Sequence, residues 1–343
     1  MGWRALEFII GLCLAGATLR DVFFTVVVPG STRGILQVSR RLVRSALAVW
    51  KQFRRRGISV NFAPVLLVGS FVTWMFLLVL AFGLMVHSLS ESFEPAIDGV
   101  GQALYIAAGA LTTMGFGATE PLHWARGVTV IASFCGLAVM TLAVTYLIEI
   151  QSNIARRDTG VLKISTSSGH PPCALALLER YSLLGSRAEL VDVLREGRTW
   201  CATVLQSHAT HPWLVYFRSV GTASGWPAAL GTLSDVSVIV ELLIEDSRMH
   251  VAAVLAREQS ERLANGLVEM LGLESQPAAA SLEDAERLCA RLTAAGYRLR
   301  EDRDIDRFLA TRNRLAGAIE AMAQHLNMQA APLLPRVQPD GYQ

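Results

Sequence analysis

Residues 110 to 121, "ALTTMGFGATEP", place two glycines around an aromatic residue directly after paired threonines. Two long segments without a charged residue flank this stretch, residues 58–86 and residues 127–148. Each is longer than the ~20 residues that a helix needs to cross ~30 Å of hydrocarbon. With 52% of its residues hydrophobic, the chain is therefore predicted to be an all-α membrane protein in which both segments are transmembrane helices.

The stretch between the two spans is predicted to enter the membrane without crossing it. Residues 96–111 are apolar but too short for a full span, and Pro95 and Asp98 suit the first turn of a helix. The two glycines of "TTMGFG", residues 112–117, favour backbone with positive φ. Irregular backbone persists at membrane depth only where it is buried in protein or lines a water-filled cavity. The segment is therefore predicted to line a pore with its carbonyl groups.

The "TTMGFG" segment resembles the T-T-V-G-Y-G selectivity signature of potassium channels. The predicted order of outer helix (60–86), pore helix and filter (96–117) and inner helix (124–150) is similar to that of their pore domain. The resemblance implies that residues 58–151 form the pore domain of a prokaryotic potassium channel with two helices and a single pore loop. Because the chain has one such loop, it also implies a homotetramer.

By this resemblance, the backbone carbonyls from Thr113 to Phe116 hold potassium ions in stacked sites, and the Thr113 hydroxyl closes the innermost site. No cofactor other than these ions is expected. Tyr105 remains of the two aromatic residues that often brace the filter from the pore helix. The implied selectivity-filter residues are Thr112, Thr113, Met114, Gly115, Phe116 and Gly117.

The segment departs from the family signature at three positions. Met114 stands in place of valine, Phe116 in place of tyrosine, and Ala118 where aspartate commonly follows. The resemblance predicts a potassium-selective channel. The alternatives are a weakly selective cation channel, which Met114 and Ala118 motivate, and a silent pore-like anchor for a helical sensor or scaffold.

Other residues of the pore domain have two interpretations each. Gly136 lies where many relatives carry a gating hinge, or it permits close helix packing. Glu120 and Glu149 are candidate acids at the outer and inner mouths, although Glu120 suits a solvated acid equally and Glu149 suits an ion pair with Arg156. Four hydroxyl residues at multiples of four are expected to share one face, either lining the cavity below the filter or hydrogen bonding within and between helices. They are Thr129, Ser133, Thr141 and Thr145.

The N-terminal region, residues 1–30, is predicted to add a third transmembrane helix over residues 5–28. Arg20 and Asp21 lie within it, and ionisable residues in lipid cost several kcal/mol unless they are paired. We interpret them as a structural salt bridge near the interface. A single arginine does not make a voltage sensor, because such sensors repeat arginine every third residue.

Residues 31–57 form a basic amphipathic segment. Eight Lys or Arg residues and no acid lie between Pro29 and Gly57, which predicts that this loop stays in the cytoplasm. The N-terminus is then outside, and everything after Ile150 is cytoplasmic. The resemblance and the simple architecture imply the inner membrane of a bacterium. Apolar residues interleaved with the basic ones favour an interfacial helix on anionic lipid, or alternatively a linker with topogenic charge only. The lipid-facing patch is Arg40, Arg41 and Arg44.

The C-terminal half is predicted to be a helical domain over residues 173–328, joined by a linker (152–172) and followed by a disordered tail (329–343). Ser281 and Asp284 favour a helix N-terminal cap. Residues 226–244 are predicted to be a buried core helix, because Asp235 interrupts a run that is otherwise apolar enough to span a membrane. The expected helices are 174–184, 186–208, 234–273, 281–295 and 303–327.

No feature of this half predicts catalysis or nucleic-acid binding, so the chain is not expected to be an enzyme. No G-x-G-x-x-G follows a strand, which argues against a nucleotide-binding domain. His208, His211 and Cys201 lack the spacing and fourth ligand of a metal site and are interpreted as ordinary residues. Cys13 and Cys135 lie in membrane segments and the other three cysteines in the cytoplasmic half, so no disulfide framework is expected. The ligand or protein partner of the helical domain is left open.

Overall fold

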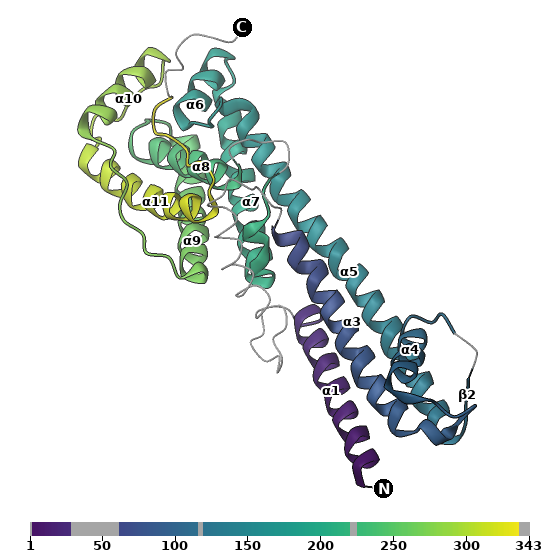
Figure 1. Ribbon diagram of the computed structural model, residues 1–343. Coiled ribbons are helices and arrows are strands. Elements are labelled where there is room, and N and C mark those ends of the chain that lie inside the picture. Colours follow the sequence, from purple (N-terminus) through teal and green to yellow (C-terminus); the bar gives the residue numbers. More distant parts are fainter. Residues whose placement is uncertain (1, 29–61, 116–118, 220–224, 336–343) are drawn as a thin grey trace, which may run out of the picture. The chain divides into compact units, whose positions relative to one another are not determined.

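The computed structural model describes residues 2–28, 62–115, 119–219 and 225–335 (Figure 1). The basic segment with Arg40, Arg41 and Arg44 lies outside the described residues, as do Phe116 and Gly117. The chain divides into two compact units, Met1–Gln151 and Ser152–Gln343. The described residues are helical nearly throughout, and the protein is an all-α membrane protein.

Among the described residues, three helices are long and apolar enough to cross a membrane. They are α1 (Gly2–Val26), α3 (Phe62–Ser88, apolar over Leu67–Ser88) and α5 (His123–Ser168). These helices overlap the three predicted spans. The predicted span over residues 5–28 includes most of α1.

In the first unit, α1 packs antiparallel along α3 (Figure 1). The helices approach closely at Gly11, where a Cβ atom would lie 2.6 Å from the carbonyl oxygen of Ala81. Polar pairs join α1 to α3 and to the turn that follows α3. The pairs are Arg4–Glu91 at 2.6 Å, Glu7–His87 at 2.7 Å and Asp21–Trp74 at 3.0 Å.

The two ionisable residues inside α1 have contacts that the sequence did not predict. Asp21 is 1% exposed and accepts a hydrogen bond from Trp74 Nε1 on α3. Arg20 is exposed, with its guanidinium 5.5 Å from the ring centroid of Phe24. A side chain of the neighbouring helix therefore binds Asp21. The sequence of α1 alone does not show which residue of another helix lies there.

The short helix α4 (Gly99–Leu111) packs against α3, where a Cβ atom on Gly83 would lie 2.5 Å from Leu104 Cδ2. It begins three residues later than predicted. Asp98 is its N-cap residue, but the Asp98 carboxylate makes no capping hydrogen bond. Instead, the Asp98 backbone N–H donates to Gln102 Oε1. Strands β1 (Phe93–Glu94) and β2 (Glu120–Pro121) pair antiparallel on either side of α4 in the chain.

Helix α5 continues well past the predicted end of the inner helix at residue 150. The expected linker over residues 152–172 is therefore wrong up to Ser168. The helix tolerates Gly160 because Trp200 fills the space beside it, with Cδ1 2.1 Å from the position of a Cβ atom. It ends where Gly169 adopts a φ of 78° and two prolines follow.

The second unit surrounds one buried helix. Every residue of α8 (Gly225–Leu242) from Gly225 to Glu241 is buried, which confirms the predicted core helix. The helices around it are α6 (Ala174–Leu183), α7 (Leu190–Thr210), α9 (Ser247–Leu271) and α11 (Ile305–Leu326), and α10 (Leu282–Ala294) packs on α6 and α11.

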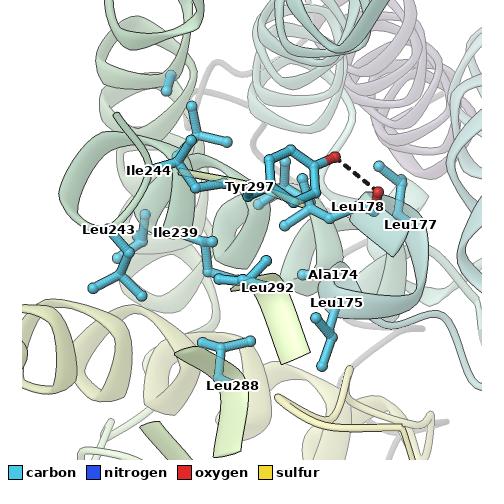
Figure 2. Packing of buried hydrophobic residues seen from close by; sticks show 14 of the residues in the cluster. Ala174, Leu175, Leu177, Leu178, Ile239, Leu243, Ile244, Leu288, Leu292 and Tyr297 are labelled. Atoms are coloured by element: carbon cyan, nitrogen blue, oxygen red, sulfur yellow. Dashed lines mark hydrogen bonds between the residues drawn. The ribbon is translucent and has the colours of Figure 1, made fainter. Parts of the chain in front are cut away.

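Figure 2 shows part of this core, where leucines of α6 and α10 meet the C-terminal end of α8. Tyr297 follows α10 and donates its hydroxyl to the carbonyl of Leu178 at 2.8 Å. The capping box of α10 is confirmed, because the Ser281 hydroxyl accepts from the Asp284 N–H and the Asp284 carboxylate accepts from the Ser281 N–H.

Two expectations for this unit are wrong. Residues 234–273 are not one helix, because the chain breaks between α8 and α9 and Asp246 caps α9 through the N–H groups of Arg248 and Met249. Residues 329–335, which we call the strap, are not disordered. Ala331 and Leu333 of the strap are buried, and Cys173 Sγ lies 3.4 Å from the Leu333 carbonyl oxygen. Residues 336–343 lie outside the described residues.

Candidate ion pathway

The signature segment begins where the pore helix α4 unwinds. The Thr112 N–H and hydroxyl both donate to the Ala108 carbonyl, at 2.9 and 2.7 Å, and the Met114 N–H donates to the Gly109 carbonyl at 2.9 Å. Thr113 and Gly115 then adopt φ values of 56° and 64°. Two of three successive residues with positive φ turn the chain out of the helix, so the predicted irregular backbone is present.

Thr113 holds an unfavourable backbone conformation. A positive φ is a rare outlier for a β-branched residue, because its side chain crowds the backbone there. Such strain costs of the order of 1–3 kcal/mol and clusters at functional sites. The positive φ of Thr113 therefore marks the segment as a candidate functional site.

The open side of the segment is solvent-exposed in the single subunit. Residues 112–115 are all exposed, and Met114 is 65% exposed. Tyr105, predicted to brace the filter, is 54% exposed on α4.

Gly136 lies directly against the end of the pore helix. A Cβ atom at this position would be 1.8 Å from the Leu111 carbonyl oxygen and 2.6 Å from its carbon. Only glycine allows α5 to approach the backbone of α4 so closely. This geometry favours the close-packing interpretation of Gly136 over the hinge interpretation.

The four hydroxyl residues of α5 do not share one face. Residues four apart on a helix are offset by about 40°, so Thr145 lies about 160° around the helix from Thr129. Three of the hydroxyls donate to carbonyls of their own helix, which is the alternative interpretation. The bonds run from Thr129 to Ala125 at 3.0 Å, from Ser133 to Thr129 at 3.1 Å and from Thr145 to Thr141 at 3.0 Å.

The exposed side of α5 includes Thr141 and Thr145, whereas Thr129 and Ser133 are half-buried. Glu149 is exposed one turn beyond Thr145. Of the four hydroxyl residues, Thr141 and Thr145 are therefore the pair on the exposed side, and Glu149 lies next to them.

The strand pair brings two acids together. Glu120 of β2 lies opposite Glu94 of β1, and both are exposed. Like charges directly opposite each other on a strand pair repel, and together they make a negative local potential. Sequence reasoning identified Glu120 but not its neighbour, because the pairing of two-residue strands across 26 positions leaves no sequence pattern.

The histidine and cysteine noted in the second unit have other partners. His208 Nδ1 lies 2.8 Å from the Val204 carbonyl oxygen, and burial lowers the pKa of His208 to about 3. Cys201 Sγ lies 3.6 Å from Ser260 Oγ, and burial raises the pKa of the Cys201 thiol to about 12. The part of the chain that the structure describes has no group of three His, Cys, Asp or Glu side chains placed to hold a metal ion.

Membrane-spanning helices on either side of a short re-entrant helix, which ends in irregular backbone, define a channel-like membrane protein. Residues 74–153 match the family model Ion_trans_2, described as "Ion channel". The match includes the second half of α3, all of α4, the signature segment and α5 up to residue 153. It supports an ion-channel pore region in this chain. Neither a curated protein nor a solved structure matches the chain.

Proposed function

We propose that the protein is a potassium-selective channel whose filter is residues 112–117. The observation that carries this proposal is the placement of Thr113 and Gly115 in positive-φ backbone at the C-terminal end of α4. Carbonyl groups freed from helical hydrogen bonding replace the water around a dehydrated cation, which is how potassium filters select. The match of residues 74–153 to an ion-channel family supports the assignment of this region.

The single loop in each chain requires four copies around one axis to surround an ion with carbonyls. The exposed face of residues 112–115 supports such an assembly, because it leaves the segment open toward other copies. The negative end of the α4 dipole points toward the same segment and favours a cation there. The Thr113 hydroxyl closes the innermost ion site, and potassium is the only bound species required.

A weakly selective cation channel is the second candidate. Met114 stands at a filter position where potassium channels carry valine, and its side chain is 65% exposed rather than packed within the subunit. A filter without packing behind this position holds its carbonyls less rigidly. Potassium over sodium selectivity is then lower, although cations still pass.

The topology proposed for this channel follows the charge distribution. The eight basic residues between Pro29 and Gly57 favour the cytoplasmic side, with Arg40, Arg41 and Arg44 on anionic lipid of the inner membrane. The N-terminus is then outside and the second unit is cytoplasmic. We expect no enzymatic activity from either unit.

The purified protein reconstituted in planar bilayers tests the proposal. Under opposed potassium and sodium gradients, with both ions present on both sides, a selective channel gives a reversal potential near the potassium equilibrium value. A reversal near zero identifies the weakly selective channel. Absence of current over a range of voltage, pH and added small molecules favours the silent anchor.

A further inference from the structure

The second unit contains an open groove that the channel function does not use. Its volume is about 750 Å³, and it lies between the start of α10, the C-terminal half of α11 and the strap. This volume falls within the range of about 300–1,000 Å³ typical of small-molecule sites. All the residues that line it belong to the second unit.

Most of the charged side chains around the groove belong to two ion pairs. Arg312 lines the groove and binds the buried carboxylate of Asp235 behind it, with N–O distances of 3.2 and 3.4 Å. Arg287 donates to Asp284 at 2.5 Å, and Asp284 also accepts from the backbone N–H of Ser281. Both guanidinium groups therefore already have carboxylate partners.

Glu320 is the third carboxylate at the groove and has no such partner. It is half-buried on α11 and makes no direct hydrogen bond or ion pair with any residue that the structure describes, although its charge acts on Arg312. Three carboxylates, of Asp235, Asp284 and Glu320, face two guanidinium groups. The carboxylates thus outnumber the guanidinium groups by one, and Glu320, the one without a direct ion pair, lines the groove.

The opposite wall of the groove is apolar and is built by the strap. Ala331 rests on α8 at Gly231, where a Cβ atom would lie 2.9 Å from the Ala331 Cβ. Leu333 is held by the contact between its carbonyl oxygen and Cys173 Sγ. With Ala323 of α11, these residues give the groove an apolar surface next to an unpaired acid.

We propose that this groove binds a small organic cation, with an ammonium or guanidinium group on the Glu320 carboxylate and an apolar body against Ala323 and Ala331. An anionic ligand fits poorly, because both arginines are already paired with carboxylates. A bare metal ion fits poorly as well, because half of the groove is apolar and a single carboxylate does not make a metal site.

The experiment uses three probes with one aromatic body and different charges: 2-phenylethylammonium, 2-phenylethanol and 3-phenylpropanoate. Binding to the full-length protein in lipid nanodiscs is measured by titration calorimetry. The ammonium probe is expected to bind, and the alcohol to bind about tenfold more weakly, as expected for loss of one hydrogen-bonded charge. The carboxylate is expected not to bind.

Glu320→Gln should weaken the ammonium probe about tenfold, to the level of the alcohol. Glu301→Gln is the matched control, because Glu301 is exposed and does not line the groove. Circular dichroism and gel filtration show whether each variant folds. If Glu320→Gln does not fold, the comparison of the three probes on the unaltered protein decides alone.

Several results would overturn the proposal. They are equal binding of the alcohol and the ammonium probe, unchanged binding in Glu320→Gln, and failure of all three probes to bind at millimolar concentration. Preferential binding of the carboxylate, lost in Arg287→Gln, would identify an anion site instead. None of these outcomes depends on ion conduction, so this inference and the channel function fail or stand separately.

Discussion

Gly136 of α5 and the Leu111 carbonyl of α4 are in direct contact, since a Cβ atom on Gly136 would lie 1.8 Å from the Leu111 oxygen. Leu111 is the last residue of the pore helix, and the signature segment follows it immediately. The position of the inner helix therefore determines the backbone position from which this segment starts. A change at Gly136 should act on the proposed filter without touching any of its residues.

We predict that Gly136→Ala displaces the end of α4 and lowers stability by about 1–3 kcal/mol per subunit, as overpacking does in other close-packed sites. Thermal unfolding in detergent should occur at a lower temperature, and potassium flux into liposomes should fall. Gly127→Ala on the same helix is the control, because a Cβ atom there has nothing within 4 Å in the subunit. Equal unfolding temperatures for both variants would contradict the contact.

The second prediction concerns the attachment of α1. Trp74→Phe removes the Nε1–H that donates to Asp21 and leaves a buried carboxylate with one donor fewer. The variant should lose about 1–3 kcal/mol of stability, the usual cost of removing a donor from a buried polar group. Differential scanning fluorimetry in detergent measures this loss. Trp3→Phe, at a site 77% exposed, should leave the unfolding temperature unchanged.

The third prediction uses the pH dependence of the second unit. Burial lowers the pKa of His208 from 6.5 to about 3, so the unfolded chain binds a proton that the folded chain does not between these values. The contribution of His208 is therefore fully present above pH 6.5 and is lost as pH falls toward 3. It adds a slope of up to about 1.4 kcal/mol per pH unit in that window.

Denaturant unfolding at a series of pH values tests this slope. His208→Gln should flatten the fall in stability between pH 6.5 and 3, because glutamine does not titrate. The exposed His170 provides the comparison, and His170→Gln should keep the full slope. Identical slopes in both variants would show that His208 does not titrate on unfolding.

The sequence predicted the elements of the pore region because membrane spans and irregular re-entrant backbone leave strong local signals. Apolar length predicted α1, α3 and α5, and the two glycines predicted positive φ in a segment where Thr113 and Gly115 adopt it. The contact of Gly136 with Leu111 was not predictable. A glycine that permits packing and one that permits bending look the same in one sequence.

The errors have two physical sources. Helix α5 runs to Ser168. Trp200, a residue distant in the chain, packs against it at Gly160. The strap is ordered because Gly231 leaves room for Ala331. Both depend on tertiary contacts. The expected shared face of Thr129 and Thr145 failed for a different reason, since a repeat of four residues drifts around a helix with 3.6 residues per turn.

The last prediction compares two substitutions in the signature segment. Gly115 has a φ of 64°, so Gly115→Ala introduces about 1 kcal/mol or more of backbone strain in every subunit. Thr113→Ala keeps the backbone carbonyl and removes only the hydroxyl. If the segment is the filter, Gly115→Ala should abolish conduction, whereas Thr113→Ala should weaken cation binding or block at the innermost site and still conduct.

Potassium flux and assembly mass, measured on the same liposome preparations of both variants, test the central claim most directly. We predict tetramers in both cases, no flux through Gly115→Ala, and flux with altered block by larger cations through Thr113→Ala. A Gly115→Ala tetramer that conducts potassium with unaltered ion preference would contradict the account, because ions would then not pass along residues 112–117.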